Sequence, residues 1–304
     1  MEKAVTISAT IAMAILILLG CKQQVITING LDYQQQDTIL TQLTKTNKSF
    51  SLFGILSDIH GNINNTAYFV QYFVDKGVDG FLLSGDIVDH FRNDVPDEKE
   101  LTDVLTVVSE PGLPVFIIPG NHETKDVYNN VLGKLKRKNI IDMTKIRRAD
   151  LEQVVIISLP GYNVPGFVAD GGFLFGDEEW QMLRNLADVR KKKILLSHQL
   201  PKSTRRNGID IAFGGKHAGD GILKRIMEEE KIDIAVGSHI HESGGQAETR
   251  NDIFVPQNTY SETLYLNPGS VTSWRFINQT KYKGLAAVLS VNETHAAYKV
   301  VAIV

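Results

Sequence analysis

The sequence has little cysteine, little net charge and no internal linker. Each of these absences excludes a class of structure or function. Its 304 residues include one cysteine, Cys21, which excludes an internal disulfide bond, so stability must come from a buried core. The formal net charge of -3 supplies no basic footprint for non-specific binding of nucleic acid, and no nucleic-acid partner is indicated. No repeat, low-complexity tract or linker divides the chain after residue 50. We therefore expect one domain over residues 50–304.

The first twenty residues have the pattern of an export signal. Lys3 precedes an apolar run that begins at Ala4 and ends at Gly20, and Cys21 follows directly. A cysteine after a small residue at this place resembles the lipobox of bacterial lipoproteins. The resemblance implies that residues 1–20 are a signal peptide, that Cys21 is lipidated, and that the protein is anchored to a membrane of the cell envelope, outside the cytoplasm. The alternative is an uncleaved signal anchor, since the run is near the short limit for a membrane-spanning helix.

The rest of the chain alternates between β and α patterns. Residues 21–49 are polar and rich in Gln, Thr and Asn, with one short β-like piece at 25–28. This composition is typical of a tether or N-terminal extension that includes either an edge strand or a short helix. From residue 50, short apolar runs typical of buried strands alternate with segments whose apolar residues recur at helical spacing. The tail, from Thr263 onward, has apolar runs separated by turns, which favours antiparallel strands. We expect strands over 52–57, 80–84, 114–118, 154–159, 193–197, 232–236, 263–266, 284–291 and 295–304, and helices over 63–76, 97–109, 125–138, 177–190 and 217–230.

Polar side chains with oxygen or imidazole donors follow five of these apolar runs. Open α/β sheets place their ligands at the carboxyl ends of buried parallel strands. Turn and cap preferences explain isolated Asp and Asn residues, but not four histidines at such positions. The candidate metal ligands are Asp58, His60, Asp86, Asn121, His198, His239 and His241, and the motif at 120–123 also contains His122.

This set of donors suits the hydrolysis of a phosphate ester. The anionic oxygens of such an ester repel a nucleophile, and two cations about 3.5–4 Å apart neutralise them and activate a bridging water. A carboxylate is needed to bridge the two ions, and Asp86, where the second strand stops, is the natural candidate. Asp58 and His60 are two residues apart and so face the same way along a strand, as do His239 and His241.

The ordered motifs resemble those of the calcineurin-like metallophosphoesterase superfamily, whose pattern is D-x-H, G-D, G-N-H-D/E, H and G-H-x-H. The resemblance covers about 52–270 and implies an α/β fold, a β-sandwich of two mixed sheets flanked by helices. It assigns Asp58, His60, Asp86 and His241 to one metal ion, and Asp86, Asn121, His198 and His239 to the second. It also implies that a metal-bridging hydroxide is the nucleophile and that His122 assists, either as general acid or by stabilising transition-state charge. One departure is Ser238, which stands where the family has glycine.

A narrower resemblance over 198–270, to the branch near class III cyclic-nucleotide phosphodiesterase-like proteins, favours a phosphodiester substrate. It indicates the loop 201–219 as a pocket wall and His217, Arg205 and Arg206 as candidate substrate-binding residues. For each of these three, an exposed structural role is an equal alternative.

The expected function is a phosphodiesterase with two divalent metal ions, Mn²⁺, Fe²⁺ or Zn²⁺. Two alternatives stay open: a phosphomonoesterase, and a catalytically silent binding or scaffold protein with the same fold. The intact Gly-Asn-His at 120–122 argues against a silent site. These patterns do not identify the substrate, the metals, the oligomeric state or the role of residues 22–49.

Overall fold

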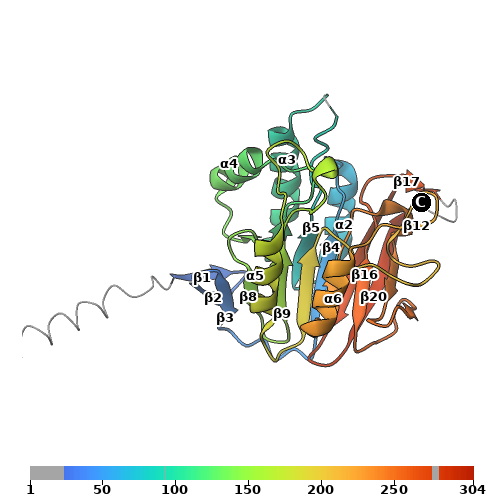
Figure 1. The fold of residues 1–304 in the computed structure, drawn as a ribbon. Helices are drawn as coiled ribbons and strands as arrows, with labels where there is room; N and C mark the ends of the chain where they lie inside the picture. The colour runs from blue at the N-terminus through green and yellow to red at the C-terminus, as the bar shows by residue number, and fades with distance from the viewer. Residues whose placement is uncertain (1–23, 93, 276–280) are drawn as a thin grey trace, which may run out of the picture.

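The computed structural model describes residues 24–92, 94–275 and 281–304, in which two large β-sheets pack face to face with helices on their outer sides (Figure 1). The expected export signal and Cys21 lie outside the described residues. Within the described part of the chain, no helix is both long enough and apolar enough to cross a membrane.

The smaller sheet has six strands in the order β20-β19-β4-β5-β6-β7. Strands β4 to β7 run parallel to one another, and β19 and β20 extend the sheet in antiparallel fashion. The carboxyl ends of β4, β5 and β6 therefore meet at one edge. The strands are β4 (Ser51–Leu56), β5 (Gly80–Ser84), β6 (Val115–Ile118), β7 (Ile140–Asp142), β19 (Gly284–Val291) and β20 (Ala296–Ile303).

The larger sheet has ten strands in the order β1-β2-β3-β8-β9-β10-β13-β16-β14-β15, and its centre from β9 to β16 is parallel. Two short hairpins, β11/β12 and β17/β18, lie outside both sheets. The strands are β1 (Gln24–Ile28), β2 (Leu31–Gln36), β3 (Ile39–Gln42), β8 (Arg148–Asp150), β9 (Val155–Leu159), β10 (Lys193–Ser197), β11 (Ile211–Ala212), β12 (Lys216–His217), β13 (Ile234–Val236), β14 (Gln246–Glu248), β15 (Phe254–Val255), β16 (Leu264–Asn267), β17 (Trp274–Arg275) and β18 (Lys281–Tyr282).

Alternate residues of the central strands face different cores. Ile55 of β4 and Leu82 of β5 point between the sheets and meet Ile194 of β10, while Leu83 and Leu195 point outward to the helices. All five are fully buried. These strands are apolar along their whole length because both of their faces are covered, which is why they read as continuous runs in the sequence.

Five α-helices cover the outer faces. Helices α2, α3 and α4 pack on the six-stranded sheet, and α5 and α6 pack on the ten-stranded sheet. Side-chain caps begin two of them: Asn62 Oδ1 accepts the Asn65 N–H at 3.1 Å, and Asp220 Oδ1 accepts the Leu223 N–H at 2.6 Å. The expected α/β architecture of two mixed sheets flanked by helices is confirmed. The helices are α2 (Ile63–Asp75), α3 (Asp97–Ser109), α4 (Lys125–Leu135), α5 (Asp177–Ala187) and α6 (Gly221–Glu229), with 3-10 turns η1 (Pro165–Phe167) and η2 (His241–Ser243).

The N-terminal extension over 21–49 contains more β-structure than the expected tether with one edge strand or short helix. Residues 24–42 form β1, β2 and β3, and β3 pairs in parallel with β8, so this segment is an integral end of the large sheet (Figure 1, blue). Ile28, Tyr33 and Leu40 are buried in the core between the sheets. The large sheet therefore begins before residue 50.

Two further expectations need correction. The tail was expected to add antiparallel strands, and β19 and β20 do so, but β16 is antiparallel only to β14 and pairs in parallel with β13. The helix expected over 217–230 begins at Gly221, because Asp220 caps it, and His217 lies in β12 instead.

Candidate metal centre

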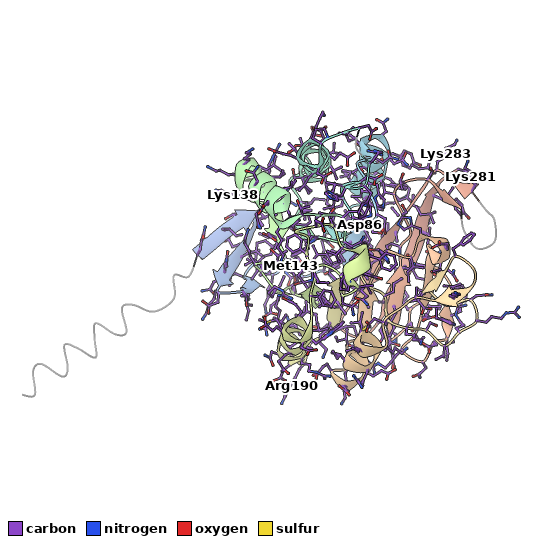
Figure 2. The ribbon with its side chains drawn as sticks, turned by 45° about the horizontal axis from the view of Figure 1, so that its top comes forward. Asp86, Lys138, Met143, Arg190, Lys281 and Lys283 are labelled. Atoms are coloured by element: carbon purple, nitrogen blue, oxygen red, sulfur yellow. The ribbon has the colours of Figure 1, made fainter. Side chains whose placement is uncertain are left out.

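The loops that follow β4, β5, β6, β10 and β13 converge on one site. They carry Asp58 and His60, Asp86, Asn121 and His122, His198, and His239 and His241, in that order, so the structure brings all seven expected ligands and His122 together. Figure 2 shows the labelled Asp86 well inside the molecule, whereas Lys138 and Arg190 lie at its periphery.

A first group of donors comprises Asp58, His60 and His241, whose ligand atoms all lie within 4.8 Å of one another. The His241 Nε2 atom is 2.9 Å from Asp58 Oδ1, and the rings of His60 and His241 are 5.5 Å apart. Asp58 is almost completely buried. One carboxylate and two imidazoles at this spacing can surround a single divalent ion.

A second group comprises Asp86, His198 and His239, again within 4.8 Å of one another. The amide oxygen of Asn121 lies between the two imidazoles, 2.8 Å from His198 Nε2 and 2.9 Å from His239 Nδ1. The Asn121 amide nitrogen donates to the Phe167 carbonyl at 2.8 Å, which orients the oxygen toward the histidines. Asn121 therefore completes this second set of ligands.

Asp86 lies between the two groups. Its Oδ2 atom is 3.2 Å from His198 Nε2 in the second group, and its charge partly offsets the effect of burial on the pKa of His60 in the first. The Oδ1 atom accepts the backbone N–H groups of Asn121 at 2.9 Å and His122 at 3.1 Å. This is the position expected of a bridging carboxylate.

The backbone at the site adopts an uncommon conformation. Asp58, His60, Asp86 and His239 all have positive φ, at 46°, 47°, 50° and 71°. Non-glycine residues in this left-handed region cost stability and persist where the surrounding structure enforces them, typically at functional sites. Here backbone hydrogen bonds enforce it: the N–H groups of Ile59 and His60 both donate to the Asp86 carbonyl, at 2.7 and 3.1 Å.

Glu123 joins two of the ligand loops. Its buried carboxylate accepts the N–H groups of Ile87 at 2.6 Å, Val88 at 3.0 Å and Asp86 at 3.2 Å in the loop after β5, and that of Gly120 at 2.6 Å after β6. The same carboxylate thus holds Asp86 beside Asn121. The sequence places Glu123 in the motif but gives no sign of this role.

The charges of the ligands are set by burial and by each other. Burial lowers the pKa of His60 to about 4 and that of His239 to about 3, so both imidazoles are neutral and able to bind metal at pH 7. Burial also opposes protonation of His198, but Asp86 outweighs it and raises the pKa of His198 to about 9. His198 in turn helps to hold the pKa of Asp86 well below its usual range, against the effect of burial.

The donor set fits divalent metal ions. The Nδ1 atom of His60 is buried in this cluster without a hydrogen-bond partner, which leaves it available to bind an ion. Neutral imidazole, carboxylate and amide oxygen together suit Mn²⁺, Fe²⁺ or Zn²⁺ rather than soft-metal chemistry.

Ser238, the departure from the family motif, fits its position. Residues with positive φ include His239 but not Ser238, so the backbone there needs no glycine. The buried Ser238 hydroxyl donates to the Ser84 carbonyl at 2.9 Å and lies 2.9 Å from His198 Nδ1, which is itself 2.9 Å from the same carbonyl. The Ser84 carbonyl can therefore orient His198 so that Nε2 faces the metal site.

Comparison with known families agrees with this geometry. The family model described as calcineurin-like phosphoesterase matches residues 51–243, more than half of the chain. The chain belongs to the calcineurin-like phosphoesterases. No curated protein sequence matches it.

Solved structures show the same fold at low sequence identity. A dimetal phosphatase from Danio rerio is 11% identical with a TM-score of 0.59, and the match covers 84% of this chain and 99% of that one. The protein TT1561 of Thermus thermophilus is 13% identical with a TM-score of 0.54, over 80% of this chain and 99% of that one. These similarities support the fold assignment alone.

His122 of this phosphoesterase lies beside the metal ligands without being one of the seven. Its Nε2 atom is 3.7 Å from Asp86 Oδ2, and its Nδ1 atom is 3.8 Å from Asp89 Oδ1. Asp89 is held in turn by Glu100, whose carboxylate accepts the Asp89 N–H at 2.8 Å. Asp89 was not among the residues expected from the sequence, although it follows Asp86 by three positions on the same loop.

A pocket of about 690 Å³ opens over the two groups of ligands. Its other walls are mostly apolar or aromatic. Ala212 and Ala218 belong to the loop 201–219 that was expected as a pocket wall, whereas the rest were not expected from the sequence, because they belong to irregular loops without a motif. These walls include Phe91, Tyr162, Val164, Phe167, Ala212 and Ala218, together with Asp89, Arg92, Glu242, Thr272 and Ser273.

The three candidate substrate-binding residues are not among those that line this pocket. Arg205 donates to Glu248 at 3.3 Å and lies over the Phe254 ring, and His217 pairs with the buried Asp210 at 2.8 Å. Arg206 is exposed. The first two brace the loop 201–219, and only Ala212 and Ala218 of that loop line the pocket.

Proposed function

We propose that this metal-dependent phosphoesterase holds two divalent ions and cleaves phosphodiesters. The observation that carries the proposal is the position of Asp86, whose carboxylate lies 3.2 Å from His198 of one group and whose carbonyl accepts the N–H of His60 of the other at 3.1 Å. Apart from Asp86, each group contains one carboxylate or amide oxygen and two imidazoles. One group would be enough to bind an ion, but a carboxylate shared between two such groups is the arrangement that two-metal hydrolysis requires.

When bound, the metal ions would neutralise the phosphate oxygens and lower the pKa of a coordinated water. The chain's own residues do the rest. Asp58, His60 and His241 would hold one ion, and Asn121, His198 and His239 the other, with Asp86 common to both.

His122 is placed to act on the substrate. It lines the pocket, with its Nδ1 atom on the side of Asp89 and its Nε2 atom on the side of Asp86. As an imidazolium, which carries a proton on both nitrogens, His122 can donate Nε2–H to the oxygen of the departing alcohol or stabilise the charge that develops on the phosphate.

The shape of the pocket supports a diester over a monoester. A monoester presents two or three charged oxygens and one organic arm, whereas a diester has two organic arms on either side of phosphorus. Tyr162, Val164 and Phe167 make one side of the pocket apolar, and on the other side the Phe91 ring stands between Asp89 and Arg92. Arg92 is the only arginine or lysine among the described lining residues.

The experiment that tests this proposal compares substrates at equal metal concentration. We would assay the purified protein with bis(p-nitrophenyl) phosphate, p-nitrophenyl phosphate and 2′,3′- and 3′,5′-cyclic nucleotides, with Mn²⁺ and with EDTA. We expect metal-dependent hydrolysis that is faster for the diesters. A preference for the monoester would overturn the diesterase assignment, and no turnover with metal bound would favour a silent binding protein.

We further propose that the protein is a lipoprotein of the cell envelope, anchored through Cys21. The support is the sequence pattern at 1–21. Expression of the full chain in a bacterium with an alkyne-labelled fatty acid should label the wild type and place it in the membrane fraction. Cys21→Ser should abolish the label, and equal labelling of both chains would contradict the anchor.

A further inference from the structure

Two aromatic walls stand at the mouth of the metal pocket, and the metal chemistry does not use them. Phe91 and Phe167 line the pocket and are 61% and 55% exposed. A single exposed phenylalanine needs no explanation, but two of them around one polar cavity leave apolar surface in water where a ligand would cover it. Such surfaces beside a few polar groups are typical of ligand sites.

The two walls contact different halves of the site. The Phe91 ring lies edge-on to His122, with centroids 4.7 Å apart, and His122 contacts His60 of the first group at 4.7 Å. Phe167 lies 5.8 Å from His239 of the second group, and Tyr162 packs on the same His239 ring at 4.3 Å. A phosphate bound over Asp86 would therefore have an aromatic surface on each side.

Hydrogen bonds fix both walls to the catalytic loops. The Phe167 carbonyl accepts the Asn121 amide at 2.8 Å, and the Ala169 N–H donates to the Asn121 carbonyl at 2.9 Å. On the other side, Glu100 binds both the Asp89 N–H and the Arg92 guanidinium, which flank Phe91. The walls are thus positioned before substrate arrives, and this lowers the entropy cost of binding.

We propose that these walls bind the two organic arms of the substrate, which is a phosphodiester with an aromatic or apolar group on each arm. The leaving arm lies on Phe91, because Phe91 contacts the histidine that protonates the leaving oxygen. The retained arm lies between Tyr162 and Phe167. This inference rests on the proposed phosphodiesterase function.

The reaction that follows is an ordinary hydrolysis. Water supplies the oxygen of the new P–O bond, and the P–O bond to the arm on Phe91 breaks. A proton from His122 Nε2 goes to that oxygen, and the water proton restores His122. The products are one alcohol and a monoester that keeps the arm bound at Tyr162 and Phe167.

The two walls can be tested separately with three aryl substrates. Bis(p-nitrophenyl) phosphate has an aryl group on both arms, methyl p-nitrophenyl phosphate only on the leaving arm, and p-nitrophenyl phosphate has no second arm. Phe167→Ala should raise KM for the bis-aryl diester about tenfold and leave KM for the other two within about twofold. Phe91→Ala should raise KM for all three, because all lose contact with the leaving aryl group.

Controls separate specificity from general damage. Phe254 is 46% exposed but does not line the pocket, so Phe254→Ala should change none of the KM values. Phe167→Leu, which keeps apolar bulk, should recover most of the affinity for the bis-aryl diester. A disturbance of His122 or His239 would instead lower kcat for all substrates by a common factor.

The outcomes distinguish this inference from the function on which it rests. If the wild type hydrolyses the diesters but Phe167→Ala alters KM equally for the bis-aryl and methyl aryl compounds, or for neither, the two-wall assignment is wrong and the diesterase stands. If the wild type cleaves no diester with metal bound, both fail.

Discussion

The carboxylate of Asp86 accepts the backbone N–H of Asn121 at 2.9 Å, which ties the end of β5 to the end of β6. Because Asn121 Oδ1 faces His198 and His239, this one bond fixes the proposed bridging carboxylate relative to the second group of candidate ligands. Other contacts support this arrangement. The Glu123 carboxylate accepts N–H groups from the loops after β5 and β6, and Asp89 lies beside His122.

Removal of the Asp86 carboxylate should reduce the amount of bound metal more than removal of a ligand that belongs to one group alone. We expect Asp86→Ala to lose both equivalents of bound metal, and Asp58→Ala to lose one, because Asp86 is the carboxylate proposed to bridge the two ions. Metal analysis of the dialysed proteins measures this. Equal loss in the two variants would contradict a bridging role for Asp86.

His122→Ala should lower kcat for a diester by about 10²–10⁴-fold, the usual contribution of a positioned acid or base. Metal content should stay unchanged, because His122 lies outside the seven ligands. Activity that survives the substitution would remove His122 from the mechanism.

Asp89→Asn should lower kcat about 10–100-fold by releasing His122 from its orienting carboxylate. Asp94→Asn is the matched control: it removes a carboxylate from the same loop that binds Arg92 and does not contact His122. If both variants lose activity equally, the loop rather than the Asp89–His122 pair is responsible.

Glu123→Ala should lower the free energy of unfolding of the metal-free protein by about 3 kcal/mol, because four buried N–H groups lose their acceptor. Denaturant unfolding measures the difference. Glu98→Ala, which removes only an exposed contact with Lys134, should change stability by less than about 0.5 kcal/mol. Similar effects of the two substitutions would show that Glu123 does not hold the loops together.

Metal binding should release protons at neutral pH. In the metal-free protein Asp86 raises the pKa of His198 to about 9 against the effect of burial, so this imidazole carries a proton at pH 7 that a metal ion must displace. The raised pKa also means that protonated His198 stabilises the metal-free fold. This stabilisation is fully present at a pH below the ordinary pKa of histidine, and it is lost as the pH rises through about 9.

Calorimetry of Mn²⁺ binding in two buffers with different ionisation enthalpies measures the released protons. We expect about one or more protons per chain at pH 7, fewer at about pH 9.5, and tighter binding at the higher pH. Release that is zero at pH 7, or unchanged between the two values, would contradict a protonated His198.

Much of the metal centre could be predicted from the sequence because its residues follow recognisable strands. Leu82 and Leu195 belong to runs that are buried on both faces, so the strand ends could be located, and Asp86 and His198 fall directly after them. The convergence itself was implied by the family resemblance and by the rule that parallel strands end at one edge.

Other features depend on contacts that no local pattern records. Strands β1 to β3 contain many Gln and Thr residues, and each has only one buried residue (Ile28, Tyr33 and Leu40). Their buried positions are therefore too sparse to distinguish these strands from a polar tether by pattern. The roles of Glu123 and Asp89 arise from hydrogen bonds and side-chain approaches across loops. Arg205 and His217 had the right chemistry for phosphate, but Glu248 and Asp210 bind them away from the pocket lining.

The most direct test of the central claim is a titration of Mn²⁺ into EDTA-stripped protein, with bis(p-nitrophenyl) phosphate hydrolysis and bound metal measured on the same samples. If the two groups of ligands around Asp86 each hold an ion, activity should be absent without metal and should reach its maximum only when two ions are bound per chain. Full activity with one ion bound, or activity that persists in EDTA, would contradict the two-metal account.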